Sequence, residues 1–89
     1  MARADLLSLD IQTNAVEGGS PDAHYQLGLL YCLGREVEHD LVTAHKWFNI
    51  AAMRGNRAAR EYRAEIASEM SKQQIAKAQK LAREWIARH

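Results

Sequence analysis

The chain has 89 residues, of which 47% are hydrophobic, and 12 basic against 11 acidic residues leave a formal charge of +1. A chain of this length forms one small domain with a marginal core, so we treat residues 1–89 as a single domain. The balanced charge gives no reason to expect a nucleic-acid partner. The single Cys32 excludes an intramolecular disulfide and suits a reducing compartment.

The first expected element is a helix over residues 3–17, which ends at Gly18-Gly19. One face of it is apolar at helical spacing and consists of Ala4, Leu7, Ile11 and Ala15. We expect this helix to act as an N-terminal cap on the helices that follow. Acidic residues interrupt its apolar run, so we do not expect a signal peptide, and no run has the length of a membrane span. A cytoplasmic protein without membrane contact is the expectation.

A second helix is predicted between Ser20-Pro21 and Gly34. Ser can cap a helix and Pro is tolerated at its first position, while Gly34 favours a left-handed cap at its end. Its apolar face consists of Ala23, Leu27, Leu30 and Tyr31. Gly28 lies in mid-helix, where Gly costs about 1 kcal/mol relative to Ala. We therefore predict that another helix crosses closely at Gly28.

A third helix is predicted from Asp40, which can act as its cap, to Gly55, which ends it. Its apolar face consists of Leu41, Ala44, Trp47, Phe48, Ala51 and Ala52. Residues 20–55 therefore form a helix–turn–helix hairpin, with small residues at the crossing and large ones beside it. The unit recurs weakly at an offset of 36, which pairs Gly19 with Gly55 and Ala23 with Ala59. Such a period is typical of stacked hairpins.

The hairpin carries the string Ala23-x3-Leu27-Gly28-x-Leu30-Tyr31-x2-Gly34-x2-Val37-x2-Asp40-x3-Ala44-x2-Trp47-x3-Ala51-Ala52-x2-Gly55. This string resembles a Sel1-like repeat, a relative of the tetratricopeptide repeat. One departure is Glu36, where the family usually has a second turn glycine. The resemblance implies an all-α fold, a short right-handed α-α superhelix of about five helices. It also implies a non-catalytic module for protein–protein interaction.

Residues 56–88 are predicted to form a degenerate repeat and C-terminal cap, a closing hairpin of two helices. Asn56 can cap a helix that runs from Arg57 to about Met70, and Ser71 with Gln74 reads as a capping box. The apolar face of the last helix consists of Ile75, Ala78, Ala82, Trp85 and Ile86. Its other side is charged, as a terminal capping helix requires.

No catalytic, cofactor or metal site is expected from the residues. A zinc site made of His24, Cys32 and His45 would draw on different helices, and we do not favour it. His45 is predicted to be exposed on the polar side of its helix, and His39 to be a solvated neighbour of the Asp40 cap. Cys32 is interpreted as a small, half-buried hydrophobic residue.

The resemblance implies that the first helix of each hairpin lines a binding groove. In the full repeat the groove residues would be Asp22, Tyr25, Leu29 and Cys32, and the degenerate repeat would add Ala58, Glu61, Glu65 and Ser68. Tyr25 and Leu29 form an apolar pair one turn apart. Two environments remain open for this pair: packing on the helix over residues 3–17, or contact with a partner.

Four arginines, Arg54, Arg57, Arg60 and Arg63, are spaced by three residues. The preferred interpretation is a solvated face that pairs with Glu61 and Glu65. The alternative is a basic patch, including Arg54 and Arg57, for an acidic partner or a nucleic-acid backbone. The net charge of +1 does not favour the nucleic acid.

These observations favour an adaptor that binds another protein or a peptide segment in the groove. One alternative is a structural homo-oligomer, such as a homodimer, formed through an incompletely covered end of the stack. A second alternative is a small regulatory protein that binds a ligand or a metal.

Overall fold

The computed structural model describes residues 20–34 and 37–89, and in these ranges the chain is helical and contains no strand. The described helices are α2 (Pro21–Leu33), α3 (Leu41–Met53), α4 (Arg57–Ala67) and α5 (Lys72–Arg88). This confirms the predicted all-α class. The fifth expected helix, over residues 3–17, lies outside the described residues. Within the described ranges, no helix is both long enough and apolar enough to cross a membrane.

Every described helix begins at the cap residue that the sequence predicts. The caps are Ser20, Asp40, Asn56 and Ser71, and the side-chain oxygen of each accepts the backbone N–H three residues ahead at 2.8–3.1 Å. Gln74 completes the capping box, since its Oε1 accepts the Ser71 N–H at 2.8 Å. These bonds satisfy N–H groups that have no partner inside the helix. The helix starts are therefore encoded locally.

The first hairpin is shaped by glycines at the ends of its helices. Gly34 has φ 67° and ψ 30°, and its N–H donates to the carbonyl of Leu30. Residues with a side chain rarely adopt this left-handed backbone conformation, whereas glycine adopts it freely. Gly55 follows Arg54, the C-cap of α3, and with φ 101° it turns the chain into α4. Helix α4 ends at Ala67, three residues before the predicted end near Met70, yet Met70 is still buried.

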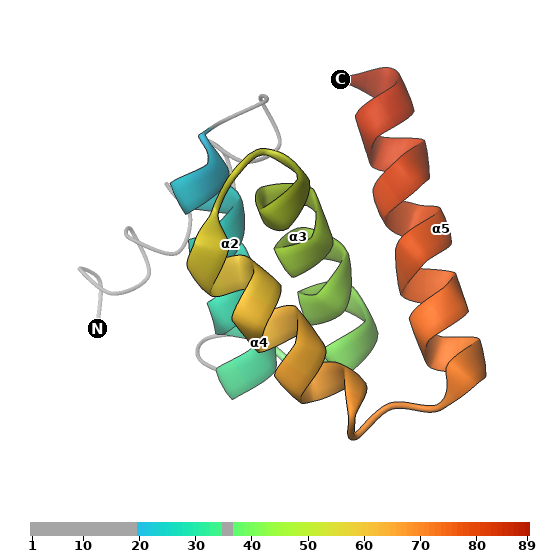
Figure 1. The fold of residues 1–89 in the computed structure, drawn as a ribbon. Coiled ribbons are helices and arrows are strands. Elements are labelled where there is room, and N and C mark those ends of the chain that lie inside the picture. Colours follow the sequence, from blue (N-terminus) through green and yellow to red (C-terminus); the bar gives the residue numbers. More distant parts are fainter. Residues whose placement is uncertain (1–19, 35–36) are drawn as a thin grey trace.

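Helix α3 occupies the centre of the molecule, and the other three described helices pack against it (Figure 1). Helices α2 and α4 also touch each other, whereas α5 lies beside α3 away from α4. The segment between α4 and α5, residues 68–71, contains no glycine, and its last residue, Ser71, begins the capping box of α5. Because the apolar face of α5 is directed at α3, α4 and α5 do not pack together as a hairpin.

The predicted close crossing at Gly28 is confirmed by its contact with Phe48 of α3. A Cβ atom built on Gly28 would lie 2.6 Å from two carbons of the Phe48 ring. Real Cβ atoms essentially never approach another heavy atom that closely. The missing side chain thus lets α2 and α3 come together, and the contact offsets the low helix propensity of Gly28.

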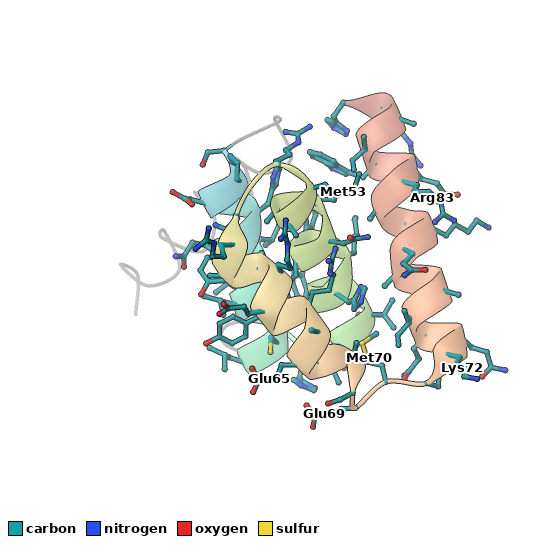
Figure 2. The ribbon with its side chains drawn as sticks, viewed as in Figure 1. Met53, Glu65, Glu69, Met70, Lys72 and Arg83 are labelled. Carbon is teal, nitrogen blue, oxygen red and sulfur yellow. The ribbon has the colours of Figure 1, made fainter. Side chains whose placement is uncertain are left out.

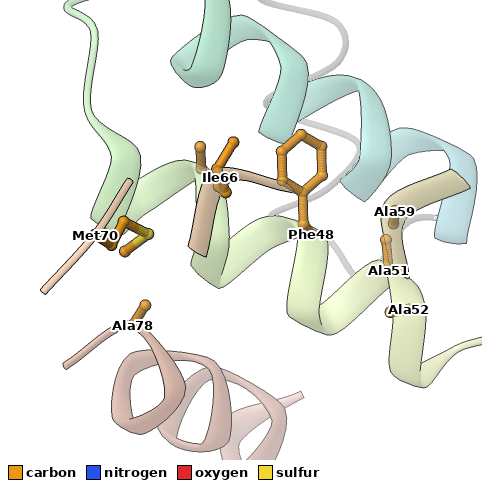
Figure 3. Close-up of a cluster of buried hydrophobic side chains, with 8 residues drawn as sticks. Phe48, Ala51, Ala52, Ala59, Ile66, Met70 and Ala78 are labelled. Atoms are coloured by element: carbon orange, nitrogen blue, oxygen red, sulfur yellow. The ribbon is translucent and has the colours of Figure 1, made fainter. Parts of the chain in front are cut away.

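The buried side chains form two clusters, both built on α3. Figure 3 shows the first, in which the Phe48 ring rises towards α2; its other members include Ala51, Ala52, Ala59, Ile66, Met70 and Ala78. The second consists of Leu27, Trp47, Ile50, Ala82 and Trp85. The first joins α3 mainly to α4 and the second joins α3 to α2 and α5. Most of the predicted apolar residues of α3 and α5 are thus buried, and Leu41, Ile75 and Ile86 are half-buried.

Candidate functional site

Three aromatic rings link α2, α3 and α4 on one side of the molecule. The Tyr25 ring centroid lies 6.0 Å from that of Phe48 and 6.0 Å from that of Tyr62, and Phe48 and Tyr62 stack at 5.6 Å. Phe48 is buried and Tyr25 half-buried, whereas Tyr62 is 37% exposed. The rings thus lead from the core to the surface at the line where α2 meets α4.

Leu29 and Cys32 continue this line along α2. Both are half-buried and pack against the Phe48 cluster. Tyr25, Leu29 and Cys32 are therefore partly covered by α3 and α4, an environment that neither sequence-based alternative described. The alternative of packing on residues 3–17 lies outside the described residues.

The side of α4 that faces this line is acidic. Glu61 and Glu65 of α4 are exposed, and so is Glu69 just beyond that helix. Figure 2 shows Glu65 and Glu69 near the C-terminal end of α4. Within residues 20–34 and 37–89 their carboxylates form no ion pair. We name the surface made by Tyr25, Leu29, Cys32, Glu61, Tyr62, Glu65 and Glu69 the α2–α4 face.

The carboxylates act on the α2 side chains across the α2–α4 face. Burial raises the pKa of the Cys32 thiol above its ordinary value, and Glu69 and Glu65 raise it further. The pKa of Tyr25 is raised by burial first, then by Tyr62 and Glu61. Cys32 is therefore a protonated thiol at neutral pH and a poor nucleophile. This agrees with its interpretation as a half-buried hydrophobic residue.

Asp22 marks the end of the α2–α4 face where α2 begins. Its Oδ1 accepts a hydrogen bond of 3.0 Å from Nδ2 of Asn56, whose own Oδ1 caps α4. One side chain thus joins the starts of α2 and α4, although both partners are in contact with solvent. The bond fixes the first helix of one hairpin beside the next.

The four arginines do not form the common surface that their spacing suggested. Arg54 lies over Trp85 of α5, with Cζ 5.3 Å from a ring centroid, and Nη1 of Arg63 donates to Oδ1 of Asn49 at 2.6 Å. Arg57 and Arg60 are exposed. The expected pairing with Glu61 and Glu65 is wrong, since these arginines form no ion pair in the described part of the chain. The bend at Gly55 and the rotation of α4 separate them.

Two of the histidines lie in the core. His24 is fully buried, stacked on Trp47 with ring centroids 5.8 Å apart and edge-on to Trp85 at 5.0 Å. The predicted exposure of His45 is wrong: it is only 3% exposed. Because α3 contacts helices on several sides, even the side of it that reads as polar is covered. His39 is exposed, as predicted, and Asp40 caps α3.

Burial makes His45 a source of pH-dependent stability. Burial lowers its pKa below the ordinary 6.5, and the nearby Arg63 lowers it further. Its Nδ1 has no hydrogen-bond partner among the described residues. As the pH falls, the unfolded chain therefore binds this proton before the folded chain does. The stability contributed by the neutral ring is complete above pH 6.5 and is lost as the pH falls from 6.5 towards the lowered pKa.

We expect urea denaturation to show this loss between neutral pH and about pH 5. The variant His45→Gln should lose part of the pH dependence, whereas the matched variant His39→Gln, at an exposed position, should keep it. If both variants kept the full pH dependence, His45 would not be the group that titrates.

No metal centre is assembled in the described ranges, where no group of three or more His, Cys, Asp or Glu side chains could hold an ion.

Two residues of the α2–α4 face were missed as site residues in the sequence. Neither Tyr62 nor Glu69 is among the groove residues expected from the sequence. The spacing of four from Glu61 through Glu65 to Glu69 was the available signal, because such residues share one side of a helix.

Residues 21–56 match the family model of the Sel1 repeat. The matched range covers α2, the turn, α3 and the cap of α4, which is the hairpin predicted over residues 20–55. This confirms the resemblance seen in the sequence. A search of curated proteins found no match to the chain.

Proposed function

We propose that this chain, in which residues 21–56 form a Sel1 repeat, is a non-catalytic adaptor that binds a partner polypeptide on the α2–α4 face. Sel1 repeats generally mediate protein–protein interaction and are generally not catalytic. The α2–α4 face lies between the first helix of the Sel1 repeat and the first helix of the next unit. That position is the one that the sequence suggested for a groove.

The proposal includes the organisation of residues 1–89 as one domain. Residues 20–55 form the full repeat, residues 56–88 a degenerate repeat with the C-terminal cap, and residues 3–17 an N-terminal capping helix. A cytoplasmic location is part of the proposal, because the single Cys32 suits a reducing compartment.

The observation that carries the proposal is the exposed part of Tyr62. The residue is 37% exposed, yet its ring centroid lies 5.6 Å from that of Phe48 and 6.0 Å from that of Tyr25. An aromatic side chain that is already ordered loses little conformational freedom on binding, and aromatic residues are frequent anchors of protein interfaces. Leu29 and Cys32 extend the apolar surface beside it.

Site-specific cross-linking tests the proposal. A photoreactive phenylalanine analogue would replace Tyr62 in one variant and Lys80, exposed on α5, in the matched control. Irradiation in the cells that make the protein should give a heterologous adduct from position 62 and not from position 80. The captured protein, once purified, should bind the unmodified chain.

Two results would count against the adaptor. An adduct from position 80 alone would move the interaction to α5. An adduct with twice the mass of the chain would instead support the homodimer alternative.

A further inference from the structure

The α2–α4 face has a one-sided charge although the whole chain is nearly neutral. Its charged members, Glu61, Glu65 and Glu69, are all acidic and exposed, and none forms an ion pair within the described ranges. The cations of α4 do not neutralise these carboxylates within the described ranges. Arg63 is bound to Asn49 of α3, and Arg57, one turn before Glu61, makes no ion pair with it. No cation of the described residues therefore occupies these carboxylates.

These carboxylates lie directly beside an apolar centre. Tyr62 is the exposed large hydrophobic residue of this face, and its ring centroid lies 6.0 Å from that of the half-buried Tyr25. The effect of Glu61 on Tyr25, and of Glu65 and Glu69 on Cys32, places the acidic groups at the same boundary between α2 and α4. A complementary ligand therefore needs positive charge and a large apolar group close together.

We propose that the α2–α4 face binds a basic segment of a partner protein, whose Lys or Arg side chains meet Glu61, Glu65 and Glu69 while a large apolar side chain lies against Tyr62. This inference rests on the proposed function and adds the chemistry of the partner. The aromatic contact supplies the affinity, because exposed ion pairs are individually weak. The charges supply the association rate and the choice of partner.

The basic helix α5 of a second copy fits this face less well than a separate partner does. Its exposed cations are Lys72, Lys77, Lys80, Arg83 and Arg88, so its charge is complementary. The exposed large hydrophobic residues of the described ranges are Leu33, Met53 and Tyr62, and none of them belongs to α5. A second copy would therefore offer the charge through α5 without the apolar group that Tyr62 requires.

A pair of synthetic helical peptides tests the charge of the partner. The first is built from Ala, Lys and Leu with the Leu residues on one face, and its twin has Glu in place of every Lys. Fluorescence anisotropy with the full chain should show binding of the Lys peptide about tenfold or more tighter than binding of the Glu peptide. The affinity for the Lys peptide should fall as salt is added.

Matched variants assign the charge effect to the face. Glu65→Lys should weaken binding of the Lys peptide by about tenfold, because it sets like charges opposite each other. Glu84→Lys makes the same change in net charge on α5, and should alter the affinity by less than about twofold. Circular dichroism should show both variants folded. Equal weakening by the two variants would overturn the inference, since net charge alone would then explain it.

Mapping of amide shifts by NMR separates failure of this inference from failure of the proposed function. Shifts in α2 and α4 with the Lys peptide support both. Tighter binding of the Glu peptide to α2 and α4 would overturn the basic partner and leave the adaptor standing. Binding of either peptide elsewhere, or of neither peptide, would overturn both. Salt-sensitive dimers in sedimentation that Glu65→Lys abolishes would overturn the basic partner in favour of a second copy.

Discussion

Replacing Trp47 by Ala is expected to lower the free energy of unfolding by about 3–5 kcal/mol. Trp47 is 6% exposed, and its ring stacks on His24 of α2 and meets Trp85 of α5 edge-on at 5.5 Å. The one side chain thus joins α2 and α5 to the central helix. Removal of the Trp47 side chain should open a cavity. It should also loosen α5, because α5 packs mainly on α3.

Urea denaturation followed by circular dichroism measures this loss. The matched control is Met53→Ala on the same helix, because Met53 is 62% exposed and its truncation should change stability by about 0.5 kcal/mol or less. A loss for Trp47→Ala no greater than that of Met53→Ala would contradict the central position of α3.

Replacing Gly28 by Leu is expected to cost about 1–3 kcal/mol or more through overpacking. The first carbon of the new side chain would already lie 2.6 Å from the ring of Phe48, which is fully buried, so the ring cannot move aside into solvent. Even Gly28→Ala should destabilise the protein, although Ala is the better helix former by about 1 kcal/mol.

A double-mutant cycle isolates this contact. In a Phe48→Leu background the ring is gone, so Gly28→Ala should become neutral or stabilising by up to about 1 kcal/mol. The effect of the same substitution then changes sign with the residue at position 48. An unchanged effect of Gly28→Ala in the two backgrounds would show that helices α2 and α3 do not cross at these positions.

The features that could be predicted from the sequence are the local ones. Ser20, Asp40 and Asn56 cap their helices through bonds that span three residues, so each cap is readable without knowledge of the rest of the fold. Gly34 is equally local, because its left-handed conformation closes a helix that has just ended. Gly28 was informative for a different reason: its cost within a helix required a tertiary contact.

The features that could not be predicted depend on which helices surround α3. His45 lies on a side of α3 that reads as polar, and only the packing of helices around α3 buries it. Arg63 does not share a surface with the other three arginines, because the orientation of α4 brings its side chain to Asn49 of α3. Neither the placement of α5 nor the rotation of α4 is encoded in the spacing of neighbouring residues.

The α2 residues of the candidate site could be predicted from the sequence, but their surroundings could not. Tyr25, Leu29 and Cys32 lie on one strip of α2, which follows from helical periodicity alone. Their environment does not follow from it, since the strip is partly covered by α3 and α4 and meets Tyr62 across the boundary. The predicted site residue Arg54 lies instead over Trp85 of α5. Which acidic side chains join the strip depends on the position of α4 beside α2.

The central claim, that the α2–α4 face is the binding surface, is tested most directly by ¹⁹F NMR of the fluorotyrosine-labelled protein. The chain has three tyrosines: Tyr25 and Tyr62 belong to this face, and Tyr31, packed against both core clusters, is the internal control. On addition of whichever of the two helical peptides binds, the signals of Tyr25 and Tyr62 should shift while that of Tyr31 stays. A shift of Tyr31 alone, or no shift of any tyrosine at saturation, would contradict the claim.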